Sequence, residues 1–240
     1  ALLRWVATCC LLLPGLPARA LDYSVGVQQL DYFPIYSGDA QGNYSGYARE
    51  LLDLFARHNG FRFVYRVRPV TRAVKEYLAG QTDFIFPDNP SWDRTAKKDL
   101  KLAYSRPAVS FEDAVMVLPE RLGSPIASLG VVRGFTPWKF LPAVRAEQLQ
   151  LQEAPGPANL IGMALLKRVD GVNIARQVAD FHLHALGRPG ALLADPALMP
   201  RAQSHYLLSS IRHPELIERF DQFLHSEQAA VAALRTKYGL

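Results

Sequence analysis

Hydrophobic and polar residues in the first half of the chain follow the spacing of strands and helices in turn. Residues 23–27 form a short β-like run, and residues 61–67 alternate between apolar and polar positions as in a half-buried strand. A turn-rich stretch over residues 31–43 precedes a helical pattern that begins near Ser45 and stops at Asn59-Gly60. The apolar positions of that helix are Tyr47, Leu51, Leu54 and Phe55.

A second helix is predicted over residues 71–79, ended by Gly80, and residues 84–86 read as a buried strand. The resulting β-α-β-α-β order favours a parallel sheet covered by helices. The second half of the chain repeats this order. Its predicted strands cover residues 129–132 and 171–174, and its predicted helices cover residues 159–167 and 214–237, with a surface loop over 153–157.

One further helix is predicted to open at Thr136, with that residue as its N-cap and Pro137 at the first helical position. Two α/β units in succession predict an α/β chain of two lobes with a cleft between them.

The first 20 residues have the order of regions found in a secretory signal. Arg4 supplies a positive charge, residues 5–13 are apolar, and Ala18-Arg19-Ala20 resembles a signal-peptidase site. The apolar run is about half of the roughly 20 residues that a transmembrane helix needs, so a membrane anchor is disfavoured. We therefore expect residues 1–20 to be a signal peptide cleaved after Ala20, and the mature protein to be periplasmic and not embedded in the membrane.

Composition narrows the class of protein further. Both cysteines of the chain, Cys9 and Cys10, lie in the predicted signal, so the mature chain would be stabilised by its core without a disulfide. The formal net charge of +5 falls to +3 without Arg4 and Arg19. Because the remaining basic residues are dispersed, nucleic-acid binding is not expected.

Several short motifs, taken in order, resemble the amino-acid-type extracellular solute-binding proteins of bacteria (family 3), which serve ABC importers. The similarity covers essentially the whole mature chain. It rests on Gly80-Gln81-Thr82-Asp83 with the strand that follows, Asp88-Asn89, Arg94, Tyr104-Ser105-Arg106-Pro107, Tyr32-Phe33-Pro34, Gln41-Gly42, Gly46-Tyr47, Glu50-Leu51, Tyr206-Leu207-Leu208, His213-Pro214-Glu215-Leu216 and Lys237-Tyr238-Gly239.

The resemblance implies the two-lobed type II periplasmic-binding (Venus-flytrap) fold. In this fold each lobe has a mainly parallel sheet flanked by helices, and two crossing strands join the lobes. Those strands are expected near residues 110–117 and 203–208. Lobe one would comprise residues 21–109 and 208–240, and lobe two, including the hinge strands, residues 110–207. Ligand would bind in the cleft, and the lobes would close on it.

The resemblance also implies a set of ligand-binding residues in lobe one. Arg94 matches the arginine that holds a ligand carboxylate, which suits the paired donors of a guanidinium. Asn89 would support the same carboxylate, and Asp88 would contribute through its backbone. Tyr32 would pack against the ligand or fill the core. Arg72 would face a second negative group or lie in solvent.

In lobe two, Phe135 and Thr136 would face the cleft at the start of the expected helix, whose N-terminus suits an anion. Asn173 would complete the site. The chain departs from the resemblance at Ala175 and Arg176, where an acid would pair with a ligand ammonium. Either Asp31, Asp88 or Asn173 substitutes for that acid, or the ligand is not a standard α-amino acid.

The sequence gives less support for a metal site or a catalytic site. His182 and His184 would share one face of a strand, but no third metal ligand accompanies them, so neither a metal nor a cofactor is expected. An enzyme on the same scaffold, such as a dehydratase, would need a general acid from among four candidates. These are Asp88, Glu112, Asp113 and His205.

The sequence thus predicts a periplasmic solute-binding protein rather than an enzyme. It would act as a monomer that captures a small polar, carboxylate-bearing solute, an amino acid or a related compound, for an inner-membrane ABC permease. A periplasmic sensor subunit with a separate signalling partner is the alternative outside transport.

Overall fold

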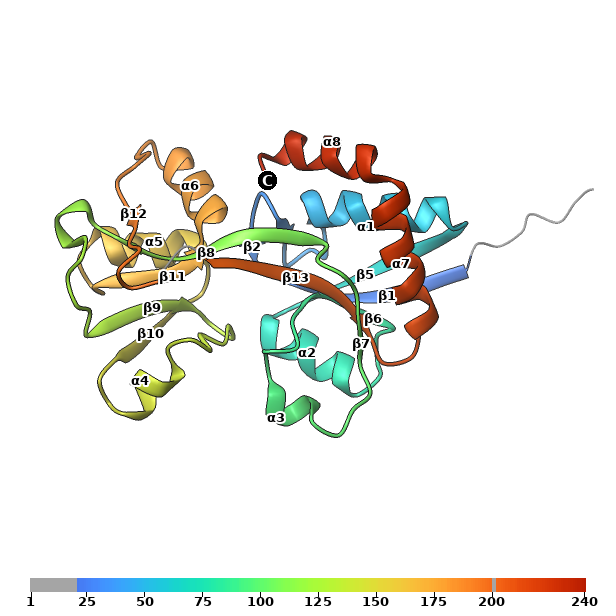
Figure 1. The fold of residues 1–240 in the computed structure, drawn as a ribbon, viewed down its shortest axis with the longest axis horizontal. Helices are drawn as coiled ribbons and strands as arrows, with labels where there is room; N and C mark the ends of the chain where they lie inside the picture. Colours follow the sequence, from blue (N-terminus) through green and yellow to red (C-terminus); the bar gives the residue numbers. More distant parts are fainter. Residues whose placement is uncertain (1–20, 200–201) are drawn as a thin grey trace, which may run out of the picture.

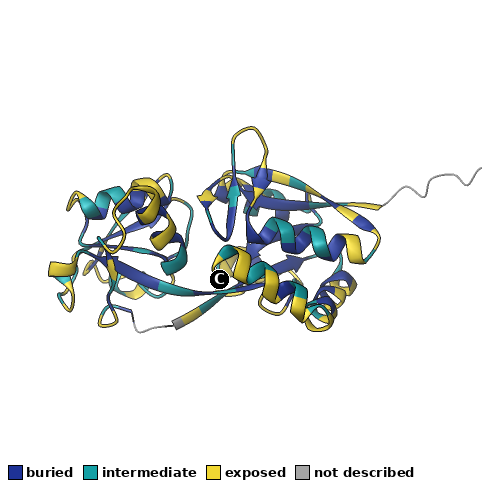
Figure 2. Cartoon of the chain, turned by 90° about the horizontal axis from the view of Figure 1, so that it is seen from above, coloured by how far each residue is buried: buried dark blue, intermediate teal, exposed yellow. Residues whose placement is uncertain are grey.

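The computed structural model describes residues 21–199 and 202–240. Two α/β lobes lie side by side, and two long strands run between them (Figure 1). Buried residues follow the strands and the inner faces of the helices in both lobes (Figure 2). The predicted α/β two-lobed architecture is confirmed. The predicted signal peptide lies outside the described residues, and within those residues no helix has the length and apolar character needed to cross a bilayer.

Lobe one is built on a parallel sheet in which β1 (Leu21–Gln28) lies between β5 (Phe61–Arg68) and β6 (Phe84–Asp88). Helix α1 (Tyr47–His58) connects β1 to β5, and α2 (Val70–Leu78) connects β5 to β6. In Figure 1, α1 and α2 cover opposite faces of the sheet. The connection from β1 leads to a strand on one side of it, and the next connection leads to a strand on its other side. The carboxyl end of β1 is therefore a topological switch point, and open α/β sheets bind ligands in the crevice at such a point.

Lobe two repeats this arrangement. Strand β9 (Ser128–Val132) lies between β10 (Gln150–Ala154) and β11 (Gly171–Ala175), and all three are parallel. The carboxyl end of β9 is therefore the corresponding switch point. The main helices of this lobe are α5 (Pro157–Leu165) and α6 (Arg176–Ala185).

The strands that join the lobes are β8 (Val109–Val117) and β13 (Ala202–Ser210), as the resemblance implied. They pair antiparallel from Val109 with Tyr206 to Asp113 with Ala202. Through this pair the strands form a continuous order, β10-β9-β11-β8-β13-β6-β1-β5, that spans both lobes. Because β8 and β13 cross from one lobe to the other, they form the hinge, and their residues lie close to both lobes.

The same aspartate-serine contact stabilises the start of the sheet in each lobe. The Asp83 carboxylate accepts hydrogen bonds from the amide and hydroxyl of Ser24 at 2.7 and 2.6 Å. The Asp170 carboxylate accepts the equivalent pair from Ser128 at 2.9 and 3.1 Å. Both aspartates directly precede a strand, so each lobe uses one carboxylate to fix the amino end of that strand against its parallel neighbour.

The turn-rich stretch predicted after β1 contains a small antiparallel sheet of three short strands. At Gly38 in this sheet a Cβ atom would lie 2.3 Å from the carbonyl oxygen of Gln28, so the backbone approach requires glycine. The tyrosine rings of this region stack in sequence, with centroids 5.3 Å apart for Tyr32 and Tyr36 and 5.1 Å apart for Tyr44 and Tyr65. The strands are β2 (Asp31–Tyr32), β3 (Tyr36–Gly38) and β4 (Tyr44–Ser45).

The remaining elements are short or close the chain. The region 214–237 that reads as one helical segment forms two helices that meet at Glu227, and in Figure 1 the last of them lies above α1. These elements are α3 (Arg94–Lys97), β7 (Ala103–Tyr104), the 3-10 turn η1 (Pro119–Arg121), α4 (Leu141–Arg145), β12 (Leu193–Ala194), α7 (Pro214–Ser226) and α8 (Gln228–Tyr238).

Three local predictions are wrong. The surface loop predicted over 153–157 is reduced to Pro155 and Gly156, because β10 ends at Ala154 and α5 begins at Pro157. No helix opens at Thr136, because the helix of this region begins at Leu141. A helix starting at Pro137 would place Pro142 in its interior, where proline lacks the N–H donor and clashes with the preceding turn. His182 and His184 lie on α6 rather than on a strand, so they do not share a strand face.

Candidate ligand-binding cleft

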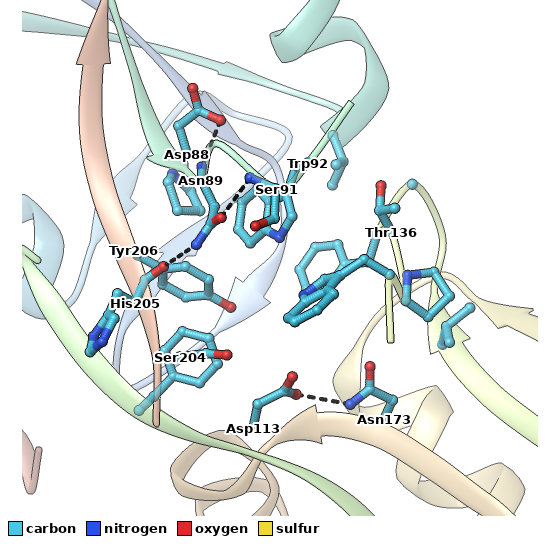
Figure 3. A pocket seen from close by; sticks show the side chains of 18 of the residues that line it. Asp88, Asn89, Ser91, Trp92, Asp113, Thr136, Asn173, Ser204, His205 and Tyr206 are labelled. Atoms are coloured by element: carbon cyan, nitrogen blue, oxygen red, sulfur yellow. Dashed lines mark hydrogen bonds between the residues drawn. The ribbon is translucent and has the colours of Figure 1, made fainter. Parts of the chain in front are cut away.

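A cavity of about 210 Å³ lies between the lobes, at the carboxyl ends of the parallel strands. Its walls come from the segments that follow β1, β6 and β9 and from the hinge strands β8 and β13. Figure 3 shows labelled side chains from the segments after β6 and β9 and from β8, β11 and β13 around one space. Since both switch points open onto this cavity, it is the position at which a two-lobed α/β protein binds a ligand.

The wall from lobe one begins at the end of β6. Asn89 is fixed by its neighbours, because its Nδ2 donates to the His205 carbonyl at 3.0 Å and its Oδ1 accepts from the Ser91 amide at 2.9 Å (Figure 3). Trp92 follows and its ring lies against Tyr206, with centroids 5.5 Å apart. The polar loop after β6 is thus held rigidly and places an indole ring in the cleft.

Beneath this wall lies an ion pair that is almost fully buried. The Lys97 Nζ atom lies 2.5 Å from the Asp88 Oδ1 atom, with exposed side-chain fractions of 7% and 5%. The second oxygen of Asp88 accepts from the Ser209 hydroxyl at 2.6 Å. Burial raises the pKa of Asp88, and the Lys97 ammonium opposes that rise. Because its oxygens are occupied within the protein, Asp88 serves to shape the cleft floor.

The wall from lobe two carries a second carboxylate. Asp113, on β8, accepts a hydrogen bond at its Oδ1 atom from the Asn173 amide at 2.9 Å, and its Oδ2 atom lies 3.5 Å from the Lys139 ammonium. Burial raises the pKa of Asp113, while Lys139 and Asn173 act in the opposite direction. Figure 3 shows Asp113 and Asn173 together on the side of the cavity opposite Asn89.

Aromatic rings contribute to the apolar surface of the cavity. The Tyr32 ring packs between Phe135 of lobe two, at a centroid distance of 5.4 Å, and Tyr206 of the hinge, at 6.4 Å. Six aromatic residues line the cavity, namely Tyr32, Trp92, Phe111, Phe135, Trp138 and Tyr206.

Direct contacts hold the two lobes together around the cavity. The Ala175 amide donates to the Tyr32 hydroxyl at 3.1 Å, and the His182 Nε2 atom lies 3.2 Å from the Asp31 carbonyl oxygen. The ring centroids of Phe33 and Phe181 are 4.6 Å apart. Each of these contacts joins lobe one to lobe two.

The structure brings six of the eight predicted site residues to the cavity and leaves two outside it. Arg94 is exposed at the start of α3 and does not line the cavity, whereas Asp93, in a left-handed conformation with φ of 48°, does. Arg72 is exposed and pairs with Glu76 at 2.6 Å on α2. The six residues that line the cavity are Tyr32, Asp88, Asn89, Phe135, Thr136 and Asn173.

The sequence reasoning did not assign Trp92, Trp138 or Lys139 to the site, and it considered Asp113 only as a catalytic acid. A signal for the tryptophans was present, because they are the two tryptophans of residues 21–240 and each follows a predicted strand of its lobe. Of the three proposed substitutes for the missing acid, Asp31 lies outside the cavity lining, Asp88 binds Lys97 and Asn173 binds Asp113.

The chain is similar in structure to several solved proteins. It superimposes with a TM-score of 0.71 and 19% identity on a histidine kinase sensor domain with similarity to periplasmic binding proteins, covering 92% of this chain and 96% of that one. An amino acid ABC transporter substrate-binding protein from Streptococcus pneumoniae bound to L-arginine has a TM-score of 0.70 at 16% identity. That match covers 90% of this chain and 94% of the other.

An ancestral amino acid-binding protein, a precursor of cyclohexadienyl dehydratase, has a TM-score of 0.67 at 15% identity, and the match covers 90% of this chain and 95% of that one. No protein-family model matches the sequence, and no curated protein matches it significantly. The chain therefore has the two-lobed α/β fold of the periplasmic binding proteins.

Proposed function

We propose that this chain is a ligand-binding protein of the periplasm that captures a small organic solute, in the size class of an amino acid, between its lobes. The observation that carries the proposal is the aromatic-lined cavity of about 210 Å³ at the facing switch points of both lobes. Lobe one would supply residues 21–109 and 208–240, and β8 and β13 would act as the hinge. Ligand binding would stabilise the closed state.

Delivery of that solute to an inner-membrane ABC permease by a monomeric, closed protein is the role we favour. The solved amino-acid-binding proteins of this fold support it. A sensor role is the second candidate, since a histidine kinase sensor domain is among the similar structures. Stimulation of a reconstituted permease's ATP hydrolysis, against a change in kinase autophosphorylation, distinguishes the two.

An enzyme of the dehydratase type remains the third candidate, because a carboxyl group with a raised pKa lies in the cleft. Of the four acids considered, Asp88, Asp113 and His205 line the cavity and Glu112 does not. Asp88 is bound to Lys97, and the His205 Nδ1 atom lies 2.9 Å from the Ser110 hydroxyl, so Asp113 is the acid that we favour for proton transfer. Turnover of prephenate by the purified protein would establish this activity, and binding without turnover would exclude it.

Isothermal titration of residues 21–240 against amino acids, dicarboxylates, polyamines and arylalkylamines tests the binding function. We expect saturable binding of at least one compound with one site per chain. Thr136→Tyr should block that binding by filling the cavity, whereas Thr95→Tyr, on the exposed surface of α3, should not. Absence of binding across the whole panel, or binding that survives Thr136→Tyr in a folded protein, would contradict the proposal.

A further inference from the structure

The charges around the cavity determine which kind of solute it accepts. Three carboxylates line it, on Asp88, Asp93 and Asp113, whereas the cationic side chain of the lining is Lys139 and no arginine of the described residues contributes. The charge of Asp88 is balanced by Lys97 from below. Lys139 lies beside Asp113, so the three carboxylates exceed the two lysines by one negative charge, and low-dielectric walls concentrate such a field on an entering cation.

The two asparagine amides that line the cavity, on Asn89 and Asn173, are already bonded within the protein. Both functional atoms of the Asn89 amide are bonded to backbone groups. The Asn173 Nδ2 atom donates to Asp113 and to the Ala114 carbonyl at 3.1 Å. Since Arg94 lies outside the cavity, the charged partner left for a ligand carboxylate in the described lining is Lys139, which already pairs with Asp113. The remaining donors of the described lining, such as the Thr136 hydroxyl, are neutral.

Asp113, by contrast, has one oxygen available for a stronger partner. Its Oδ1 atom is fixed by Asn173, but its Oδ2 atom lies 3.5 Å from Lys139, at the outer limit of a hydrogen bond. A ligand ammonium would approach to about 2.7–2.9 Å and form a charge-assisted hydrogen bond. The Asp113 side chain is 17% exposed, so a cation bound there would be largely shielded from water.

The aromatic lining favours the same charge. A cation is attracted to the face of an aromatic ring within about 6 Å, and the attraction is greatest for tryptophan. Trp92 comes from lobe one and Trp138 from lobe two, and Tyr32, Tyr206 and Phe135 also line the cavity. These rings also provide a flat apolar surface for an aromatic body of the ligand.

We infer that the cleft selects a compact organic cation with an aromatic or apolar body and no carboxylate, an arylalkylamine, whose ammonium group binds the Asp113 carboxylate between the aromatic rings of the two lobes. This inference rests on the proposed binding function and narrows its ligand class.

Three compounds that share one aromatic body but differ in charge test the inference by isothermal titration. Phenethylamine is a cation, L-phenylalanine a zwitterion and 3-phenylpropionate an anion. We expect phenethylamine to bind more tightly than phenylalanine by about ten-fold or more, since the carboxylate of the zwitterion would compete with Asp113 for Lys139, and 3-phenylpropionate to bind most weakly.

Two variants with matched controls assign the contact. Asp113→Asn should weaken phenethylamine binding by about ten-fold or more, whereas Asp99→Asn, on an exposed loop, should leave it unchanged. Lys139→Met should strengthen phenethylamine binding, because it removes the protein's own competitor for Asp113, and the exposed Lys101→Met should not. Thermal melting confirms that each variant is folded.

The outcomes separate the two proposals. Tighter or equal binding of phenylalanine or 3-phenylpropionate, or wild-type affinity in folded Asp113→Asn, would overturn the cation inference while the binding function stands. If no compound of the wider panel binds, the binding function falls and the inference with it. Binding led by phenethylamine and lost in Asp113→Asn would support both.

Discussion

Replacement of Lys97 by methionine is a sharp test of the cleft floor. Methionine keeps the length of the side chain but leaves the Asp88 carboxylate, 5% exposed, without the ammonium that lies 2.5 Å away. Removing one partner of a buried ion pair costs about 3–5 kcal/mol of folding free energy. For a chain of this size, each kcal/mol corresponds to about 2–4 °C, so we expect the melting temperature to fall by about 6–20 °C.

The pH dependence of this loss has a defined sign. Burial raises the pKa of Asp88 in the folded protein. Without Lys97 that pKa should rise further, so the folded variant holds a proton at a pH where the unfolded chain has released it. Stability is then retained at acid pH and falls as the pH rises through the folded-state pKa. The deficit of Lys97→Met relative to wild type should therefore grow from about pH 4 to pH 8.

Urea unfolding followed by circular dichroism measures these differences directly. Lys98→Met is the matched control, since Lys98 is 68% exposed and its loss should change stability little. Adding Asp88→Asn to Lys97→Met should recover part of the loss, because the amide carries no charge. A deficit below about 1 kcal/mol, or a double variant no more stable than Lys97→Met, would refute the buried-pair reasoning.

Three further substitutions test the lobe contacts and the backbone. Tyr32→Phe removes the acceptor for the Ala175 amide between the lobes, so ligand affinity in calorimetry should fall about five-fold, about 1 kcal/mol, and an unchanged affinity would contradict a closing role. Burial alone would raise the pKa of Asp170, but hydrogen bonds from the Ala127 and Ser128 amides and the Ser128 hydroxyl bring that pKa below its ordinary value. The stability that these hydrogen bonds give above about pH 4 is therefore lost as the pH falls through the folded-state pKa. Asp170→Asn should flatten this acid loss in urea titrations, and an unaltered profile would exclude that role. Gly38→Ala should lower the free energy of unfolding by about 1–3 kcal/mol, whereas Gly162→Ala, in an open position on α5, should raise it by about 0.5–1 kcal/mol. Equal effects of the two substitutions in thermal melts would count against the close contact at Gly38.

The fold could be predicted well because its signals are local. Helix α1 and strand β5 each carry their own periodicity, and the alternation of strands and helices sets a parallel sheet. The helix expected at Thr136 failed because Pro142, six residues further on, excludes it. Secondary structure is therefore predicted correctly where the residues of one segment are enough to determine it.

The site was harder to predict because it depends on contacts between distant segments. Asp113 and Asn173 meet through the pairing of β8 with β11, and no short motif encodes that pairing. Arg94 is one of the residues on which the resemblance rests. It follows the left-handed residue Asp93, however, and its side chain lies outside the cavity. Residue identity at a motif position thus did not fix the direction of its side chain.

The central claim, that a solute binds between the two lobes, is tested most directly by tryptophan fluorescence. Residues 21–240 contain two tryptophans, Trp92 in lobe one and Trp138 in lobe two, and both line the cavity. Titration of the single-tryptophan variants Trp92→Phe and Trp138→Phe with the tightest-binding compound of the panel should change the emission of both, with a midpoint that agrees with the calorimetric affinity of each variant. A response confined to one variant, or to neither, would contradict a ligand held between the lobes.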